Sequence, residues 1–295
     1  MASLKQISNK ISSVKGTRRI MSAMKLIAAV KLQKAQSILM SYRPYSDSYL
    51  DIAKGLANNS DESVHPLLRN SEEKKSLNIV FMTSDRGLCG SFNSSLIRKI
   101  ETFIKTETKG YEKVIITSIG RKGRDHFKKS DLEQAGSHDG ITERNYENYT
   151  KNIASEIAGN FVGGKTDEVM LVYNYFKSAL TQEMQMEKLL PIPRTQSSGE
   201  EEKQGEFIFE PNKNEVLKYV LSNYVEVRVQ RALLESVTSE HGSRMTAMDN
   251  ATRNADSVVR NLTLLFNKTR QASITTELMD IVNGTEALRK GGGMD

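Results

Sequence analysis

The C-terminal part of the chain carries a regular pattern of apolar and polar positions. Apolar or small residues recur there at alternating steps of three and four, which predicts a helix with a heptad-type stripe. The stripe consists of Met245, Met248, Thr252, Ala255, Val259, Leu262 and Phe266. The run from Asn212 to Lys290 contains no proline, so we expect one continuous helix. At about 1.5 Å per residue it would be roughly 120 Å long, which predicts a rod.

A second stripe of the same kind opens the chain and predicts a helix from Met1 to about Ala57. Apart from Arg18 and Lys25, its positions are apolar or aromatic. They are Leu4, Ile7, Ile11, Val14, Arg18, Met21, Lys25, Ala28, Leu32, Ala35, Leu39 and Tyr42. Such a stripe needs a partner stripe, so we expect the two terminal helices to pair in antiparallel orientation.

The two predicted helices differ in length. If the two helices are aligned at the inserted segment between them, roughly 23 residues of the second helix, from about Asn267 onward, have no partner. This expected tip is rich in small and hydroxyl-bearing residues, which suit a surface that slides past others. They include Thr269, Ser273, Thr275, Thr276 and Thr285.

The middle of the chain changes character. A polar segment from Asn58 to Ser76 predicts a loop, and short apolar runs then alternate with helical patterns. Strands are expected at Leu77–Thr83, Val114–Ile119 and Glu168–Tyr175, and a polar-flanked run follows at Met184–Leu190. Helices are expected from Ser91 or Asn93 to Lys109, at Gly120–Lys128 and at Tyr146–Val162. This alternation predicts a small parallel α/β sheet.

The expected fold is therefore a mixed α/β architecture with three parts. Residues 1–57 and 210–290 form a long antiparallel coiled coil, and residues 77–195 form a small inserted Rossmann-like α/β domain. Thr195–Gly205 is polar and rich in glycine and charge, and predicts a loop. Asn212 with Glu215 three positions later predicts a capping box that opens the last helix.

The net charge of +6 is concentrated at the N-terminal end. Residues 1–46 contain nine Lys or Arg and no acidic residue, so the rest holds 42 − 9 = 33 basic and 36 acidic residues. A helix bearing on an acidic protein partner explains this best. A mitochondrial presequence, a nucleic-acid-binding helix and a solvated back face are the alternatives. Presequences are shorter than this stripe, and because Met1 leads directly into it we expect no targeting segment, which favours a bacterial protein.

Composition excludes several classes of site. The only cysteine, Cys89, cannot form an intramolecular disulfide and fits a reducing compartment. The four histidines are scattered without a second ligand at metal spacing, so we expect no metal site. No apolar run approaches the ~20 residues that span a bilayer.

One segment matches a phosphate-binding loop literally. Residues Gly159 to Thr166 read G-x-x-x-x-G-K-T. That motif requires a strand before the loop and a helix after it, so that the helix N-terminus faces the phosphates. Here a helix is expected before it and a strand after it. We therefore interpret Gly163 and Gly164 as a helix stop and expect no bound nucleotide or other cofactor.

The turn from Ser84 to Asn93 lies between a predicted strand and a predicted helix. Gly87 and Gly90 would permit a tight turn there. A catalytic Cys89 would need a nearby base, and no histidine is close in sequence. We interpret the segment as a structural or partner-binding turn.

Three blocks of the sequence are distinctive. They are Ile7–Ile20 with Ala23-Met24 and Lys31–Gln36; Ser84–Gly90; and Asn267–Gly284. Together they resemble the gamma subunit of F-type ATP synthases. The resemblance covers nearly the full chain. It departs at Thr285, where the family usually has alanine, and at Gly242-Ser243, which replace small alanines.

The resemblance implies a single central stalk inside a ring of three alpha and three beta subunits. The inserted domain and the lower coiled coil would bind the epsilon subunit and the membrane ring of c subunits. Some residues would contact the beta subunits: Arg270, Gln271, Thr275, Arg244, Met24, Asp85, Arg86 and Cys89. The family binds no nucleotide on this subunit.

We therefore expect a rotor shaft without an active site. It would couple ion-driven rotation of the c-ring to sequential changes in three catalytic beta subunits. It would be peripheral, on the cytoplasmic side of a bacterial plasma membrane. A basic coiled-coil protein that binds nucleic acid is the alternative function, and salt-dependent retention on DNA would favour it.

Overall fold

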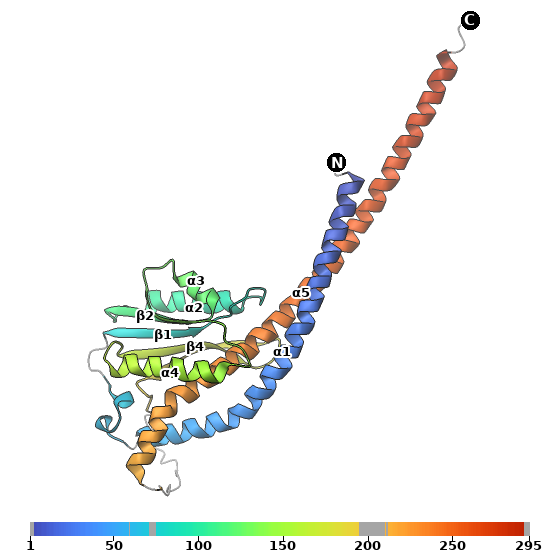
Figure 1. The fold of residues 1–295 in the computed structure, drawn as a ribbon. Helices are drawn as coiled ribbons and strands as arrows, with labels where there is room; N and C mark the ends of the chain where they lie inside the picture. Colours follow the sequence, from blue (N-terminus) through green and yellow to red (C-terminus); the bar gives the residue numbers. More distant parts are fainter. Residues whose placement is uncertain (1–2, 59, 71–74, 195–209, 211, 292–295) are drawn as a thin grey trace, which may run out of the picture. The chain divides into compact units, whose positions relative to one another are not determined.

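The computed structural model describes residues 3–58, 60–70, 75–194, 210 and 212–291 (Figure 1). The predicted loop Thr195–Gly205 lies outside the described residues. The chain divides into two compact units, which we call the sheet unit (Ile27–Ala247) and the terminal unit (Met1–Leu26 with Met248–Asp295). Two long helices, α1 (Leu4–Asn58) and α5 (Lys213–Gly291), contribute residues to both units. Their ends fall within a few residues of the predicted ones.

The sheet unit is built around a five-stranded sheet. Its strands are β1 (Ser76–Met82), β2 (Lys113–Ile119), β3 (Glu133–His138), β4 (Glu168–Phe176) and β5 (Gln182–Leu190). They lie in the spatial order β3-β2-β1-β4-β5. Strand β1 pairs in parallel with β2 and β4, and β2 with β3, whereas β5 is antiparallel to β4. The sheet is therefore mixed.

The prediction of a wholly parallel sheet was wrong for β5. Only Lys177–Thr181 separates β4 from β5, and the N–H of Ser178 donates to the carbonyl of Thr181 at 3.0 Å across this turn. A parallel return needs a crossover of about a dozen residues or more, whereas a short turn can only give an antiparallel hairpin. Loop length decides the strand direction here.

Strand β3 was missed by the sequence analysis. Its sequence, EQAGSH, contains no β-branched residue and no Phe, Tyr or Trp, so it lacks the composition that identifies strands. The strand lies at the edge of the sheet, and its side chains alternate between exposed and half-buried. Pairing with β2, and not its own propensity, makes this segment extended.

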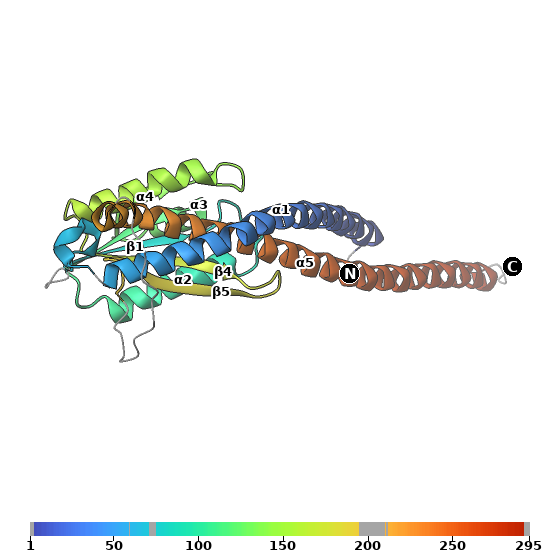
Figure 2. The same cartoon turned by 90° about the horizontal axis from the view of Figure 1, so that it is seen from below.

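Helices cover both faces of the sheet. Helices α2 (Phe92–Glu107) and α3 (Arg121–Phe127) lie on one face, and α4 (Tyr146–Val162) with the first part of α5 on the other (Figures 1 and 2). Ranges predicted for α2, α3 and α4 agree with the structure. Within the predicted loop Asn58–Ser76, the described residues include two short 3₁₀ turns, Glu62–Val64 and Pro66–Leu68.

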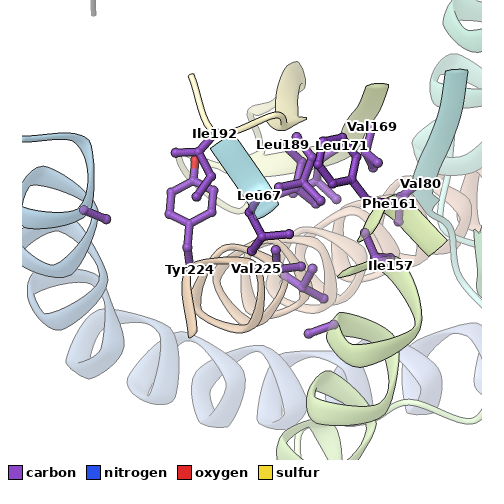
Figure 3. Close-up of a cluster of buried hydrophobic side chains, with 14 of the residues drawn as sticks. Leu67, Val80, Ile157, Phe161, Val169, Leu171, Leu189, Ile192, Tyr224 and Val225 are labelled. Atoms are coloured by element: carbon purple, nitrogen blue, oxygen red, sulfur yellow. The ribbon is translucent and has the colours of Figure 1, made fainter. Parts of the chain in front are cut away.

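The larger apolar core lies between the sheet, α4, α1 and α5. Figure 3 shows β-strand side chains such as Val80, Leu171 and Leu189 facing Ile157 of α4 and Val225 of α5. A second core on the opposite face packs the other side chains of β1 against α2 and α3. Because β1 is buried on both faces, its residues Ile79–Met82 form a continuous apolar run and not an alternating one.

The start of α5 has one of the two bonds of the predicted capping box. The N–H of Glu215 donates to Asn212 Oδ1 at 3.0 Å, and Asn212 Nδ2 donates to Glu215 Oε1 at 2.8 Å. The first bond satisfies an N–H group that the helix itself leaves free. The second links the two side chains, in place of the side chain-to-backbone bond of a full capping box.

In the terminal unit, ion pairs join the first half of α1 to the central part of α5. Arg18 pairs with Asp256 at 2.5 Å, and Lys25 with Asp249 at 2.5 Å. From the first pair to the second, the residue number increases in α1 and decreases in α5, so the two segments are antiparallel. The less exposed positions of α5 continue at steps of three and four through Phe266 and Thr269 to Ser273. From Ile274 to Ala287 every residue is exposed, so the uncovered stretch begins later than the expected Asn267.

The sheet unit buries a histidine without a hydrogen bond. His241 of α5 is 6% exposed, and neither of its ring nitrogens has a partner. Its Nε2 lies 3.8 Å from Glu143 Oε2, which is too long for a hydrogen bond. Burial, with the positive charges of Lys31 and Arg244, lowers the pKa of His241 to about 4 despite the nearby Glu143. The imidazole is therefore neutral at pH 7.

We predict that Phe161→Ala destabilises the sheet unit by about 3–5 kcal/mol. The ring is fully buried in the larger core, and its removal leaves a cavity. Urea unfolding of the isolated chain, followed by circular dichroism, measures the change. Val162→Ala is the matched control, because Val162 is the next residue of α4 and is 49% exposed. Equal losses for the two variants would contradict the prediction.

We predict that His241 makes the protein less stable at acid pH. Its pKa in the folded state, about 4, lies below its usual value of 6.5, so the unfolded state binds the proton more tightly. This contribution is complete above pH 6.5 and is lost as pH falls toward 4, by up to about 1.4 kcal/mol per pH unit.

Urea unfolding at a series of pH values between 4 and 7 tests this. His241→Gln should flatten the pH dependence of the free energy of unfolding relative to the wild-type chain. The control is His126→Gln, because the His126 side chain is 45% exposed. The prediction is wrong if wild-type and His241→Gln chains lose stability in parallel.

Candidate functional site

The turn after β1 is closed by its own side chains. Asn93 Oδ1 accepts from the N–H of Ser84 at 2.9 Å, and Asn93 Nδ2 donates to Ser84 Oγ at 2.7 Å. Ser84 Oγ in turn donates to the carbonyl of Arg86 at 2.6 Å. Although Asn93 was considered as a helix cap, Ser91 holds the N-cap position of α2. Asn93 instead fixes the shape of the turn.

The turn presents some residues outward and buries others. Cys89 is 2% exposed and receives a hydrogen bond from Asn93 Nδ2 at 3.3 Å. Burial raises the pKa of the Cys89 thiol. Leu88, by contrast, is 63% exposed and has a φ of 65°, a left-handed conformation that is uncommon outside glycine. Arg86 is also exposed. The outward surface of the turn is therefore made by Arg86 and Leu88.

Asp85 ties this turn to its neighbours. Its Oδ1 accepts from the N–H of Arg121 at 2.9 Å, and its Oδ2 accepts from the N–H of Gly140 at 2.8 Å. Arg121 begins α3 after β2, and Gly140 follows β3. One carboxylate thus connects the loops at the carboxyl ends of three adjacent parallel strands.

Arg244 of α5 holds the turn through hydrogen bonds to its backbone. Its Nη2 donates to the carbonyls of Arg86 at 3.1 Å and Gly87 at 3.2 Å, while its Nη1 lies 2.5 Å from Glu240 Oε1. The Arg244 and Glu240 side chains are only 12% and 18% exposed. Burial raises the pKa of Glu240 although Arg244 opposes this. The guanidinium is therefore largely engaged inside the chain.

Helix α5 also lies across the point where a ligand binds in many α/β folds. Such ligands bind at the carboxyl ends of the strands, where the strand order reverses, and here that point is between β1 and β4. Ser239 Oγ donates to the carbonyl of Asn174 at 3.1 Å, and Thr246 Oγ1 donates to that of Ala179 at 3.0 Å. A Cβ added to Gly242 would lie 3.2 Å from Ala179 Cα. One face of α5 closes this end of the sheet.

The segment that matches a phosphate-binding loop has the predicted order, with α4 before it and β4 after it. The N–H groups of Gly163, Gly164 and Lys165 donate to carbonyls of α4 at 2.9–3.1 Å. Gly164 has a φ of 71°, as expected for the residue that ends a helix. These N–H groups are engaged by the helix and do not form a cradle for phosphate.

The remaining candidate residues lie in the terminal unit. Arg270, Gln271 and Thr275 are exposed on α5, and Met24 is half-buried on α1. Thr275 Oγ1 donates back to the carbonyl of Gln271 at 2.9 Å. Arg270 and Gln271 fall in the last covered turn of α5, and Thr275 just beyond it. The structure thus divides the eight candidates between its two units.

Sequence reasoning missed residues that hold the turn in place. Asn93 was considered only as a cap, and Glu240 was not singled out. The pair Glu240 and Arg244, four residues apart on one helix face, is a signal that could have identified Glu240. The contacts of Asp85 join segments far apart in sequence and have no such signal.

In the part of the chain that the structure describes, no helix is both long and apolar enough to cross a membrane. Nor do three His, Cys, Asp or Glu side chains of the described residues gather where they could hold a metal ion.

Comparison with solved structures supports the observed fold. The chain is 27% identical to one in the central stalk and c-ring of the Tetrahymena thermophila mitochondrial ATP synthase, with a TM-score of 0.59, covering 79% of this chain and 99% of that one. A chain of the Euglena gracilis mitochondrial ATP synthase matches with a TM-score of 0.68 at 18% identity, covering 99% of this chain and 96% of that one. The second likeness concerns the fold alone.

Comparison of sequences is more specific. The family model described as ATP synthase matches residues 3–288. The ATP synthase gamma chain of Geobacter metallireducens is 41% identical, covering 98% of this chain and all of the relative. That of Lawsonia intracellularis is also 41% identical, with the same coverage. None of these findings supports the alternative of a nucleic-acid-binding protein. The chain belongs to the family of ATP synthase gamma chains.

Proposed function

We propose that this chain is the rotor shaft of an ATP synthase. It would couple ion-driven rotation of a c-ring to sequential conformational changes in three catalytic beta subunits. The observation that carries the proposal is the end of α5, where Ile274–Ala287 is entirely exposed. Leu278, Met279, Ile281 and Val282 there are each more than half exposed. Apolar side chains uncovered over such a length indicate a surface that a partner covers.

The asymmetry of a single shaft provides the coupling. A shaft inside a ring of three alpha and three beta subunits cannot present the same face to all three catalytic sites at once. Each beta subunit therefore meets a different surface, and differential contact shifts its conformation. Rotation passes these contacts from one beta subunit to the next. The shaft needs no active site and no bound cofactor for this role.

We propose that α1 and α5 form an antiparallel coiled coil in the shaft. The ion pairs Arg18–Asp256 and Lys25–Asp249 support this arrangement, as does the heptad spacing of the less exposed positions. Residues 1–57 and 210–290 would form the shaft, and residues 77–195 the foot that binds the epsilon subunit and the c-ring. The protein would be peripheral on the cytoplasmic side of a bacterial plasma membrane, which its bacterial relatives support.

Two groups of residues would contact the beta subunits. Arg270, Gln271 and Thr275 form the first, with Met24 on α1. In the second group, exposed Arg86 would make direct contact, while Asp85, Cys89 and Arg244 would hold the turn in shape. Exposed ion pairs contribute only about 0–1 kcal/mol each, which suits contacts that must break and re-form at every step.

We predict that Arg270→Ala combined with Gln271→Ala lowers coupled ATP synthesis by about tenfold, through the loss of a charge-assisted hydrogen bond. The variant complex should still contain this chain with alpha and beta chains in a 1:3:3 ratio. Synthesis is measured in membrane vesicles. Asn267→Ala with Lys268→Ala is the matched control, because both residues are exposed on the same helix. Unchanged synthesis in the test variant would argue against these contacts, and failure of the wild-type chain to co-purify with alpha and beta chains would argue against the whole proposal.

We predict that Arg244→Ala loosens the turn and makes Cys89 more reactive. Cys89 is the only cysteine of the chain, so modification by a maleimide reports on the turn alone. The wild-type thiol should react slowly at neutral pH, because it is buried and its pKa is raised; only the thiolate reacts. Arg253→Ala is the control, since the Arg253 side chain is 76% exposed. Equal reaction rates in wild-type and Arg244→Ala chains would show that Arg244 does not support the turn.

A further inference from the structure

A buried carboxylate joins three elements of the sheet unit. The side chain of Glu235, on α5, is fully buried. Its Oε1 accepts from Arg43 Nε at 3.0 Å and Arg231 Nε at 2.8 Å. Its Oε2 accepts from Arg43 Nη2 at 2.7 Å and from the N–H of Phe176 at 3.0 Å. Arg43 belongs to α1 and Phe176 is the last residue of β4, so one side chain connects two helices to the sheet.

The two arginines extend these contacts. Arg43 Nη2 also donates to the carbonyl of Phe176 at 2.7 Å, and its guanidinium lies 4.8 Å from the ring centroid of Tyr175. Arg231 Nη1 donates to Ser46 Oγ, to the carbonyl of Arg43 at 3.3 Å and to Asp47 Oδ1 at 3.1 Å. We call Arg43, Ser46, Asp47, Arg231 and Glu235 the Glu235 cluster. Its contacts hold α1 and α5 to each other as well as to β4.

The position of the cluster matters because of how the chain enters and leaves the sheet. Helix α1 leads into the start of β1, and the end of β5 leads toward α5. Leu77 of β1 pairs with Glu168 of β4, and Val169 pairs with Leu190 of β5. Both covalent connections therefore meet the sheet at the amino edge of its parallel strands. The Glu235 cluster lies at the opposite edge, where β4 ends. Ser239, Thr246 and Arg244 of α5 also donate to backbone carbonyls at this end. The Glu235 cluster differs from them because its Arg43 joins α1 to the same edge.

Apolar packing beside the cluster cannot by itself fix the angle between the helices and the sheet. Phe176, Leu39 and Leu234 form a small buried group at the same place. Hydrophobic burial is non-directional, so such a contact resists separation better than rotation or sliding. Charge-assisted hydrogen bonds are short and directional, and buried polar groups fix register in some proteins. The cluster adds angular definition to a contact that apolar burial already holds together.

We propose that the Glu235 cluster is a positioning device that locks the carboxyl edge of the sheet to both long helices. Torque applied to the sheet unit then passes into the helices without slip. Arg43, Arg231 and Glu235 are its positioning residues, and none needs to touch a partner. This inference rests on the proposed rotor function, in which the sheet unit is the driven end of the shaft.

The decisive variant is Glu235→Gln, tested in the whole ATP synthase. Glutamine keeps the shape of glutamate but removes the charge and directs an NH₂ group at one of the guanidinium donors. We expect the variant complex to assemble and the detached complex with alpha and beta chains to keep its rate of ATP hydrolysis. ATP-driven ion pumping by membrane vesicles should be largely lost. A merely structural role would not separate pumping from hydrolysis.

Two further variants complete the experiment. Glu183→Gln is the matched control, because Glu183 forms an ion pair with Lys177 beside the same strand end but is 45% exposed; its pumping should equal that of the wild type. Arg43→Met and Arg231→Met with Glu235→Leu replace these three charged side chains by apolar ones of similar size. This triple variant should fold and hydrolyse ATP yet pump poorly, because it restores the packing but not the directional hydrogen bonds. This variant decides the question if Glu235→Gln does not fold.

Some outcomes would overturn the proposal. If Glu235→Gln pumps like the wild type, or if pumping and hydrolysis decline in equal proportion, the cluster only stabilises the fold. Full pumping by the apolar triple variant would show that directional hydrogen bonds are not needed. Failure of the wild-type chain to assemble with alpha and beta chains is a different result, because it would contradict the proposed function itself.

Discussion

A helix as long as α5 cannot bury its own apolar stripe, so each part of it depends on another surface to cover it. Its first part, around Leu221 and Val225, packs into the core of the sheet unit. Its middle, from Glu235 to Thr246, contacts the ends of the strands through polar groups. From Met248 to Ser273 its less exposed positions follow a heptad pattern, and from Ile274 onward its described side chains are exposed. These successive environments separate the regions that hold the fold from the region left for a partner.

The same helix covers the carboxyl end of the sheet. In open α/β sheets, ligands bind where the strand order reverses, beyond the carboxyl ends of the strands. Here Ser239 and Thr246 donate hydrogen bonds to backbone carbonyls at that end, and Gly242 allows the helix to approach closely. The N–H groups of the loop that resembles a phosphate site are engaged by α4. Fold alone does not determine function; in this chain α5 packs against the end of the sheet where an open α/β fold would have room for a ligand.

Much of this architecture could be predicted from periodicity. The stripes of α1 and α5 were visible because long helices repeat their pattern many times. Arg18 and Lys25 looked out of place on the first stripe, and the structure explains them by their pairing with Asp256 and Asp249. Strand β3 and the direction of β5 were missed because pairing partners and loop length, and not local propensity, determine them. The wholly exposed end of α5 begins at Ile274. The sequence had led us to expect it at about Asn267, on the assumption that the two helices start side by side.

The roles of individual polar residues were the least predictable. Asp85 binds N–H groups 36 and 55 positions away, and Glu235 binds an arginine 192 positions away. No spacing rule connects residues so far apart in one sequence. Such contacts become visible only when the fold brings α1, α5 and the strand ends together.

The placement of charge follows a physical logic that agrees with a rotating part. Where elements of the chain must keep one orientation, as at Glu235 and Arg244, the charged groups are buried and bound by several partners. Their separation would leave an uncompensated charge in a low-dielectric interior, which is strongly unfavourable. Where contacts with other subunits would have to change at every step, as at Arg86 and Arg270, the charged groups are exposed and their pairing is weak. A shaft would require both kinds of contact: buried charges with several partners where one orientation must be kept, and exposed charges where contacts must exchange.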